Sequence, residues 1–571
     1  GVAKRATELV AEGNATSRDA SSTAWALAKA KGRLSRKLAH DAATAMAVVL
    51  GTRPTSEFST QDVSNGAWAL ATLLYADGAR ASKTSQAATR RAFARFASVV
   101  EERPEQFEAQ HVANLAWAAA TCAKGAAVTK KTARRIFVSV AREASRRFFF
   151  EDDYDERALA VVSWALATFS RLSEGGVPDD VEDFFTDLAR FWGESESEKK
   201  KKTMSALNVA TCAWALAAHA TSSSPFTGND DDDERTQLLR AFEGLTESVL
   251  NHREWPSPQA VANVLWAYSS VPDVKKPAEV YAHLADVALA KMHSFSGTDV
   301  GSVAWAFAAA NVRHDELFEA LARRLARVET VDAWGLVNVA SAYAFFYEDD
   351  PSASDLFATV ASRTLAQLHE FGPRQLATVA SAFAKARRGP AEASAPRLLA
   401  AVAQAARPVL EDDTAEWTSL DVVELATAFA GAKDLLPEAD ALVVRLADLA
   451  VQDLDSLRHD AKQRGQLCKA LLRVQQGTRQ SRRNHDLLAF VDHDFAGLAD
   501  KHRNSDKVCA LLFSPVGEAT GVEVLDVLEY DDVFARQDAS SSSSSAASSS
   551  SDDDSVFPFS PPPPGSVFVS S

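Results

Sequence analysis

The stretch HVANLAWAAA, residues 111–120, carries a pattern that recurs along this chain of 571 residues. Related stretches are QDVSNGAWAL at 61–70, QAVANVLWAY at 259–268 and DVGSVAWAFA at 299–308. Aligning the copies on their tryptophan, called here the anchor, gives Trp25, Trp68, Trp117, Trp164, Trp214, Trp266 and Trp305. The frame continues with another residue in the anchor place at Ser341, Ser381 and Thr427. Ten copies, spaced 36 to 52 residues apart, predict a repeat protein.

Each copy carries a helix-start signal nine residues before its anchor. The residues at that place are Thr16, Ser59, Glu108, Asp155, Ser205, Ser257, Ser296, Asp332, Gly372 and Thr418. Eight of the ten are Ser, Thr or Asp, whose side-chain oxygens accept the free N–H groups of a first helical turn. Asp follows three residues later in four copies, at Asp19, Asp62, Asp299 and Asp421. Pro258 and Pro373 stand in the first-turn position that Pro tolerates. Each anchor is therefore expected on a capped helix of about four turns.

A second apolar-periodic segment follows each anchor, for example at 315–328, 355–368 and 439–450. One repeat is then a helical hairpin. The chain is predicted to be all-α, a right-handed α-solenoid of about 10–11 hairpin repeats over residues 1–480, with a degenerate copy near Lys469. A terminal helical unit or cap is expected at 481–533. The Ser/Asp/Pro-rich residues 534–571 cannot bury a core and are expected to form a disordered tail.

The charge is unevenly distributed along the chain. Its formal net charge is −16, yet residues 1–150 hold 23 Lys and Arg against 12 Asp and Glu, a net +11. The remaining residues hold 38 against 65, a net −27. This asymmetry predicts a basic end suited to a polyanion and an acidic end that is not.

Other features exclude several protein classes. The four cysteines, Cys122, Cys212, Cys468 and Cys509, are far apart and form no CxxC pair, which argues against a disulfide framework or a zinc site. No run of about 18 apolar residues predicts a membrane span. No targeting peptide is recognisable at the start of the sequence, and no cofactor, metal or small-molecule substrate is expected.

The anchor tryptophans have two interpretations. On a helical wheel, the large aliphatics Val112, Leu115, Val300, Val303 and Phe307 point away from the anchor, towards the second helix. The residue after every anchor is Ala, which indicates close approach of a neighbouring backbone. The tryptophans are therefore interpreted as packing wedges between repeats. The alternative is a column of rings on which unpaired bases stack.

Two positions one turn apart, seven and three residues before the anchor, are called here positions −7 and −3. They carry mostly polar side chains, which vary while the frame does not, and this suits a protein that reads one base per helical unit. The predicted base-reading residues are Arg18, Gln61, Asn65, Gln110, Asn114, Arg157, Gln259, Asn263, Asn338 and Arg374. The structural alternative is that Asn at −3 bonds a neighbouring loop backbone.

Basic residues on the second helices are predicted to contact phosphates. They are Arg90, Arg91, Arg95, Lys130, Lys131, Arg134 and Arg135, with Arg146 and Arg147 as further members.

The frame polar-Q-x-hydrophobic-A-N-x-x-W-A-[LFY]-A, clearest in QHVANLAWAAA, resembles the octotricopeptide repeats of algal organellar proteins. It is also similar to the helical repeats of FAST-kinase-like mitochondrial proteins and of a trypanosome mitochondrial RNA-editing substrate-binding subunit. The resemblance covers roughly residues 10–475. It implies a protein of mitochondrion or chloroplast, in ribonucleoprotein granules, that binds single-stranded organellar RNA and works with other RNA-processing proteins. Many relatives end in a small RAP domain with ascribed nuclease character, but its pattern is not found in 481–571.

No catalytic motif is recognisable in the sequence: there is no Walker loop, GxSxG or HExxH. His485, Asp492 and His493 form the densest His/Asp stretch, for which a solvated helix face is the simpler interpretation than a metal site. The chain is therefore predicted not to be an enzyme. RNA binding is the leading hypothesis, and a solenoid that scaffolds other proteins is the alternative.

Overall fold

The computed structural model describes residues 2–436, with gaps at 12–14, 76–80, 152–154, 174–175, 195–203, 223–231, 272–273 and 412–416, and a few positions between 439 and 470. Every regular element in this part of the chain is a helix, which confirms the all-α class. The predicted cap at 481–533, the tail at 534–571, the copy near Lys469 and the His/Asp stretch lie outside the described residues.

All ten predicted N-caps are helix N-caps in the structure. In α4 (Thr60–Leu74), Ser59 Oγ accepts a hydrogen bond from the Asp62 backbone N–H at 3.2 Å, and Asp62 Oδ2 accepts one from the Ser59 N–H at 3.0 Å. The same reciprocal box forms at the three other copies with Asp in the third position. The first helix of each repeat therefore begins where its local sequence predicts.

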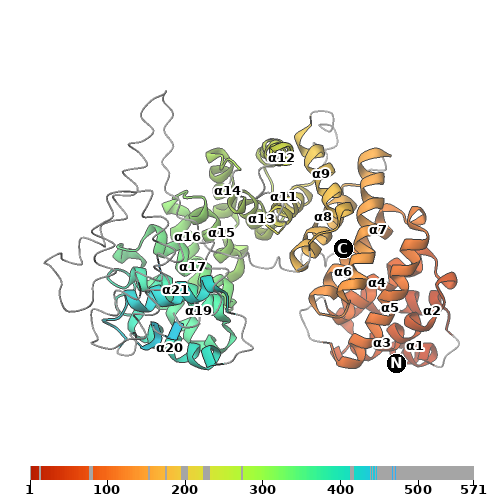
Figure 1. Ribbon diagram of the computed structural model, residues 1–571, viewed down its shortest axis with the longest axis horizontal. Coiled ribbons are helices and arrows are strands. Elements are labelled where there is room, and N and C mark those ends of the chain that lie inside the picture. Colours follow the sequence, from red (N-terminus) through yellow and green to blue (C-terminus); the bar gives the residue numbers. More distant parts are fainter. Residues whose placement is uncertain are drawn as a thin grey trace, which may run out of the picture. The chain divides into compact units, whose positions relative to one another are not determined.

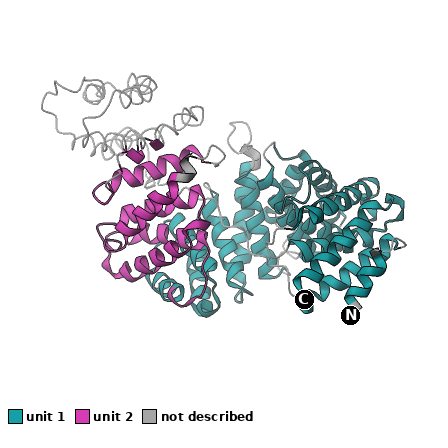
Figure 2. Cartoon of the chain, turned by 90° about the horizontal axis from the view of Figure 1, so that it is seen from below, with its two compact units in different colours: residues 1–325, 561–571 teal, residues 326–560 magenta. Residues whose placement is uncertain are grey.

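The described residues form two compact units, which divide within α16 (Asp315–Arg327); unit 1 runs to Leu325 and unit 2 begins at Ala326 (Figure 2). In unit 1 the first helices of successive repeats pack side by side. These are α2 (Ser17–Lys29), α4, α6 (Ala109–Lys124), α8 (Glu156–Leu172), α11 (Ala206–Ala220), α13 (Pro258–Ser270) and α15 (Gly297–Ala309).

The second helices of unit 1 form their own row, in which each packs against the next from α1 to α14. The row consists of α1 (Val2–Ala11), α3 (Arg36–Thr52), α5 (Lys83–Glu102), α7 (Lys130–Ser145), α9 (Asp179–Gly193), α12 (Asp232–Asn251) and α14 (Ala278–Lys291). Figure 1 shows the two rows, with α7, α9, α12 and α14 in one and α6, α8, α11 and α13 in the other. Hairpins stacked in series are the arrangement of an α-solenoid. The right-handedness of the solenoid stays a prediction.

The core lies between the two rows. Val112, Leu115, Val300, Val303 and Phe307 are each at most 2% exposed, which confirms that the aliphatic face of each first helix is buried. Phe307 of α15 meets a tyrosine of α14, Tyr281, edge to face with ring centroids 5.3 Å apart. The alanine that follows the anchor is fully buried in the repeats of α4, α6, α8, α11, α13 and α15. Small side chains here let neighbouring first helices approach closely.

Unit 2 repeats the hairpin arrangement with Ser or Thr in the anchor place. Its helices are α17 (Ala333–Phe346), α18 (Ser354–Ala366), α19 (Pro373–Ala386), α20 (Ala395–Glu411) and α21 (Ser419–Gly431). The first helices α17, α19 and α21 pack in series, and the second helices α18 and α20 pack together. The predicted second helices at 315–328 and 355–368 correspond to α16 and α18. None of the described helices has the length and apolar character needed to cross a bilayer.

Candidate nucleic-acid interface

The anchor tryptophans divide into two groups by exposure. Trp117, Trp214, Trp266 and Trp305 are 3 to 7% exposed, which confirms the packing interpretation for these four. Trp214 and Trp266, from consecutive repeats, have ring centroids 6.0 Å apart. By contrast, Trp25 is 42% exposed, and the anchors of α4 and α8 are half-buried. The more accessible rings therefore lie within the first four repeats.

Two lysines cover these accessible rings. Lys29 Nζ lies 5.8 Å from the centroid of the Trp25 ring and 5.2 Å from that of Trp68, so it lies between the anchors of α2 and α4. Lys124 Nζ of α6 lies 4.8 Å from the Trp164 ring of α8. A cation over an indole face contributes about 0.5–1 kcal/mol at an exposed site. Sequence reasoning missed both lysines, although each stands at the end of a first helix, four or seven residues after its anchor.

The Gln and Asn side chains at positions −7 and −3 bond to each other. Gln110 Nε2 donates to Asn114 Oδ1 at 2.8 Å, and the equivalent bonds of α4 and α13 measure 3.3 and 2.8 Å. Asn114 Nδ2 also donates to Ser64 Oγ of α4 at 3.0 Å. The half-buried Asn thus bonds a side chain of the neighbouring repeat, whereas the structural alternative placed its partner in a loop backbone. The exposed Gln110 keeps its carbonyl oxygen to accept a further hydrogen bond.

Exposure at position −7 falls along the chain. Arg18, Gln61, Gln110 and Arg157 are exposed on the consecutive first helices α2, α4, α6 and α8. Gln259 and Asn263 of α13 are both half-buried. Asn338 of α17, at position −3, is 1% exposed, so a bound base would not reach it without rearrangement. The structure thus brings the predicted −7 residues together on one row only in the first four repeats.

Arg374 is used inside unit 2. Its guanidinium lies 2.9 Å from Asp421 Oδ1 and 3.2 Å from Glu424 Oε2, and 17% of its side chain is exposed. Burial raises the pKa of Glu424, and the charge of Arg374 opposes that rise. A guanidinium held by two buried carboxylates is poorly placed to read a base. Of the predicted base-reading set, Asn338 and Arg374 are the residues whose surroundings are structural.

The predicted phosphate-binding residues on α5 and α7 fall into two groups: two are bonded within the protein and five are exposed. Arg90 donates to the Ala126 carbonyl at 2.8 Å, and Arg135 pairs with Glu101 while donating to Ser98 Oγ at 3.1 Å. The hydrogen bond to Glu101 raises the pKa of Arg135. The other five residues of the set, Arg91, Arg95, Lys130, Lys131 and Arg134, are exposed.

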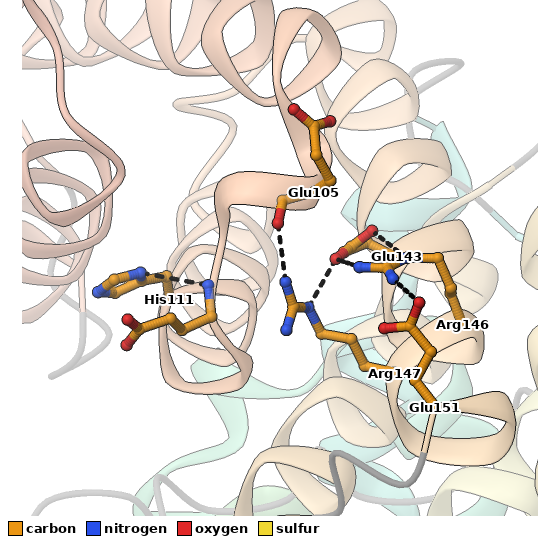
Figure 3. Close-up of polar contacts among 7 residues, drawn as sticks. Glu105, His111, Glu143, Arg146, Arg147 and Glu151 are labelled. Atoms are coloured by element: carbon orange, nitrogen blue, oxygen red, sulfur yellow. Dashed lines mark hydrogen bonds and ion pairs between the residues drawn. The ribbon is translucent and has the colours of Figure 1, made fainter.

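The two arginines that follow α7 form an internal ion network. Arg147 donates to Glu143 Oε1 at 2.6 Å and to the Glu105 carbonyl at 2.9 Å (Figure 3). Arg146 pairs with Glu143 and with Glu151, and its pKa is raised mainly by the bond to Glu143. This network ties the π-helical turn Arg146–Phe150 to α7 and to the turn before α6. Both arginines are therefore already engaged in contacts within the protein, which hold these elements together.

Ser170 of α8, His219 of α11 and the half-buried Glu182 of α9 form a hydrogen-bonded chain. His219 Nδ1 lies 3.1 Å from Ser170 Oγ, and its Nε2 lies 2.8 Å from Glu182 Oε2. Ser170 is 1% exposed and His219 4%, and the imidazole stacks on Phe185 at 3.9 Å. A buried Ser170 hydroxyl has no access to a substrate. We therefore interpret these hydrogen bonds as contacts that hold the three helices together. No group of three or more His, Cys, Asp or Glu side chains suited to a metal ion occurs within the described residues.

The geometry can be compared with known proteins at this point. Residues 245–408 match the family of the RNA-editing substrate-binding complex 6 protein. The match runs from within α12 to within α20 and includes the copies anchored at Trp266, Trp305, Ser341 and Ser381. It supports the resemblance to the RNA-editing complex helical family; the octotricopeptide and FAST-kinase-like resemblances stay predictions. No curated protein matches the chain.

Proposed function

We propose that this chain is a non-catalytic, single-stranded RNA-binding solenoid that acts in RNA editing or a related step of RNA processing in the mitochondrion. The family match to an RNA-editing substrate-binding complex protein supports the RNA-processing role. The resemblance noted for the repeat frame supports the organelle. The exposed polar residues of the described repeats are assigned a role in binding, and the proposal includes no catalytic step.

One observation carries the RNA-binding part of the proposal. Arg18, Gln61, Gln110 and Arg157 occupy the same frame position on four adjacent helices, and all four are exposed. At two of these repeats an Asn one turn away holds the Gln through a hydrogen bond, so the amide is preorganised. Arg18, Gln61 and Gln110 lie within residues 1–150, which carry a net charge of +11, and Arg157 lies just beyond them. Fixed frame, variable polar group and positive field are what base-by-base reading of a polyanion requires.

Titration of the chain into fluorescently labelled single-stranded RNA, followed by anisotropy, tests the proposal. We expect binding that weakens as NaCl rises from about 50 to 200 mM, because phosphate contacts release counterions. A duplex of the same sequence is the control and should bind less tightly, since its bases are paired. Absence of binding at low salt, or affinity independent of salt, would contradict the proposal.

A protein-scaffolding role is the second candidate, favoured by unit 2. There Arg374, at the −7 position that the proposal assigns to RNA in unit 1, pairs instead with Asp421 and Glu424. The residues after 150 carry a net charge of −27, which repels RNA and suits a basic protein partner. Affinity capture from mitochondrial extract with and without ribonuclease separates the two roles. A stoichiometric protein partner retained after ribonuclease treatment, with no RNA binding by the purified chain, would favour the scaffold.

A further inference from the structure

Two cations occupy one frame position in consecutive repeats. Lys124 ends α6, seven residues after Trp117, and Arg171 lies in the last turn of α8, seven residues after Trp164. The Lys124 ammonium lies 4.8 Å from the centroid of the Trp164 ring. The indole ring of Trp164 in one repeat thus lies against the ammonium group of Lys124 from the preceding repeat.

The two cations stand at the same end of two first helices, α6 and α8, that pack against each other. Burial, followed by the charge of Arg171, lowers the pKa of Lys124 to about 8, and burial also lowers the pKa of Arg171. Both residues keep contact with solvent, yet the protein packed around their charged groups disfavours the charged forms. Within the described residues, neither side chain has a carboxylate ion-pair partner. A bound anion would offset the repulsion.

Stabilisation of the helix dipole does not account for the pair. Cations favour the negative end of any helix, so that role predicts them at the ends of first helices throughout the chain. The last turns of α4, α13, α15, α17 and α21 hold none. Among the described first helices a Lys or Arg stands in the last turn of α2, α6, α8 and α19, and three of these four helices belong to the first four repeats.

We propose that Lys124 and Arg171 form an anchor for one backbone phosphate of the bound RNA strand; this rests on the proposed function. An Arg guanidinium bonds two phosphate oxygens at once, and a Lys ammonium supplies a point charge beside it. The pair lies at the opposite end of α6 from Gln110, about 21 Å away at 1.5 Å per residue. A strand that reaches both groups therefore spans several nucleotides. The anchor holds the backbone without reading sequence.

This assignment differs from phosphate binding on the second helices, and matched variants separate the two. K124Q/R171Q removes two charges from the proposed anchor, and R91Q/R95Q removes two exposed charges from α5. The swap K124R/R171K keeps the charge of the anchor. Thermal unfolding followed by circular dichroism is measured for each variant to establish that it is folded.

The readout is anisotropy with labelled oligouridylate and with a mixed-sequence RNA, over a range of NaCl concentrations. We expect K124Q/R171Q to bind both RNAs roughly tenfold more weakly and to lower the slope of log affinity against log salt by about 0.7, the value for one phosphate of a single strand. R91Q/R95Q and the swap should keep the wild-type slope.

The other outcomes overturn the inference in distinguishable ways. Equal losses in K124Q/R171Q and R91Q/R95Q would mean a general electrostatic effect without an anchor. Wild-type affinity and slope in K124Q/R171Q would remove the anchor and leave the proposed function standing. A wild-type chain that binds neither RNA removes the proposed function and the anchor together.

Discussion

Position −7 is used in opposite ways by the first repeats of unit 1 and by the repeats of unit 2. In α6 it holds Gln110, exposed and bonded only within its own helix by the contacts described above. In α19 it holds Arg374, which is largely buried and paired with two carboxylates of α21. The frame position is the same, so the frame alone does not decide how the side chain is used.

Arg374 reaches positions −6 and −3 of the next first helix. Opposite Arg374 these positions are Asp421 and Glu424, both carboxylates. In the first helix that follows Gln110, the same two positions hold Ala158 and Val161, whose side chains offer no hydrogen-bond partner. A polar side chain with no partner on the next helix stays available to a ligand. The comparison teaches that one frame position can be exposed in one repeat and paired within the protein in another.

The largest effect is expected at the anchors. Trp117→Ala should destabilise unit 1 by about 3–5 kcal/mol, because it leaves a cavity between repeats. Ser341→Ala is the matched change at an anchor of unit 2 and should cost less than about 1 kcal/mol. Urea unfolding followed by circular dichroism measures both. If the Trp117 change leaves stability intact and abolishes RNA binding, the anchor and the base-reading position have exchanged roles.

The next effect is expected at Arg374. Arg374→Gln should lower stability by about 3 kcal/mol at neutral pH, because two buried carboxylates lose their counter-charge. Arg157→Gln, at the same frame position on α8, should stay within about 0.5 kcal/mol of the wild type.

The pH dependence of the Arg374→Gln loss sharpens this test. Burial already raises the pKa of Glu424, and removing the guanidinium takes away the opposing influence. A raised carboxyl pKa gives stability that is present at low pH and is lost as pH rises through the folded value. The deficit of the variant should therefore shrink as pH falls towards 5. A deficit independent of pH would mean that packing, and not charge, is lost.

A smaller effect is expected at the amide pair of α6. Gln110→Ala should leave stability within about 0.5 kcal/mol, because the side chain is exposed, and Asn114→Ala should cost about 1 kcal/mol through its bond to Ser64. Both should change discrimination between RNA sequences by about 1–2 kcal/mol. Competition binding with a pool of oligonucleotides measures the preference. Unchanged preference in a folded Gln110 variant would leave the pair a structural role only.

The smallest effect is expected at His111, in the box at the start of α6. Burial, together with the charge of Arg147, lowers its pKa, and Glu108 opposes the shift. The folded state therefore favours neutral imidazole, and its contribution to stability is present above about pH 6.5 and is lost as pH falls through the folded pKa. His111→Gln should flatten the stability profile between pH 7 and 5, measured as melting temperature. The same acid-induced loss in the variant would rule His111 out as its source.

Much of the fold and part of the site could be predicted from sequence. The ten caps, the aliphatic face and the buried alanines depend on residues within one or two helical turns, so periodicity and local hydrogen bonding reveal them. Gln110 and Asn114 followed from the same frame. Lys29 and Lys124 did not, because the rings they cover belong partly or wholly to the next repeat.

The sequence by itself determined where each first helix begins, which of its faces is apolar and where the repeats lie along the chain. Each of these features depends on interactions within a single helix. Only the tertiary structure decided which polar positions remain at the surface, which arginines pair internally and which rings carry a cation. In the contacts between repeats the partners lie some 34 to 50 residues apart, for example Arg374 and Asp421 or Lys124 and Trp164. Loops of varying length separate the partners, so only packing of one hairpin on the next brings them together.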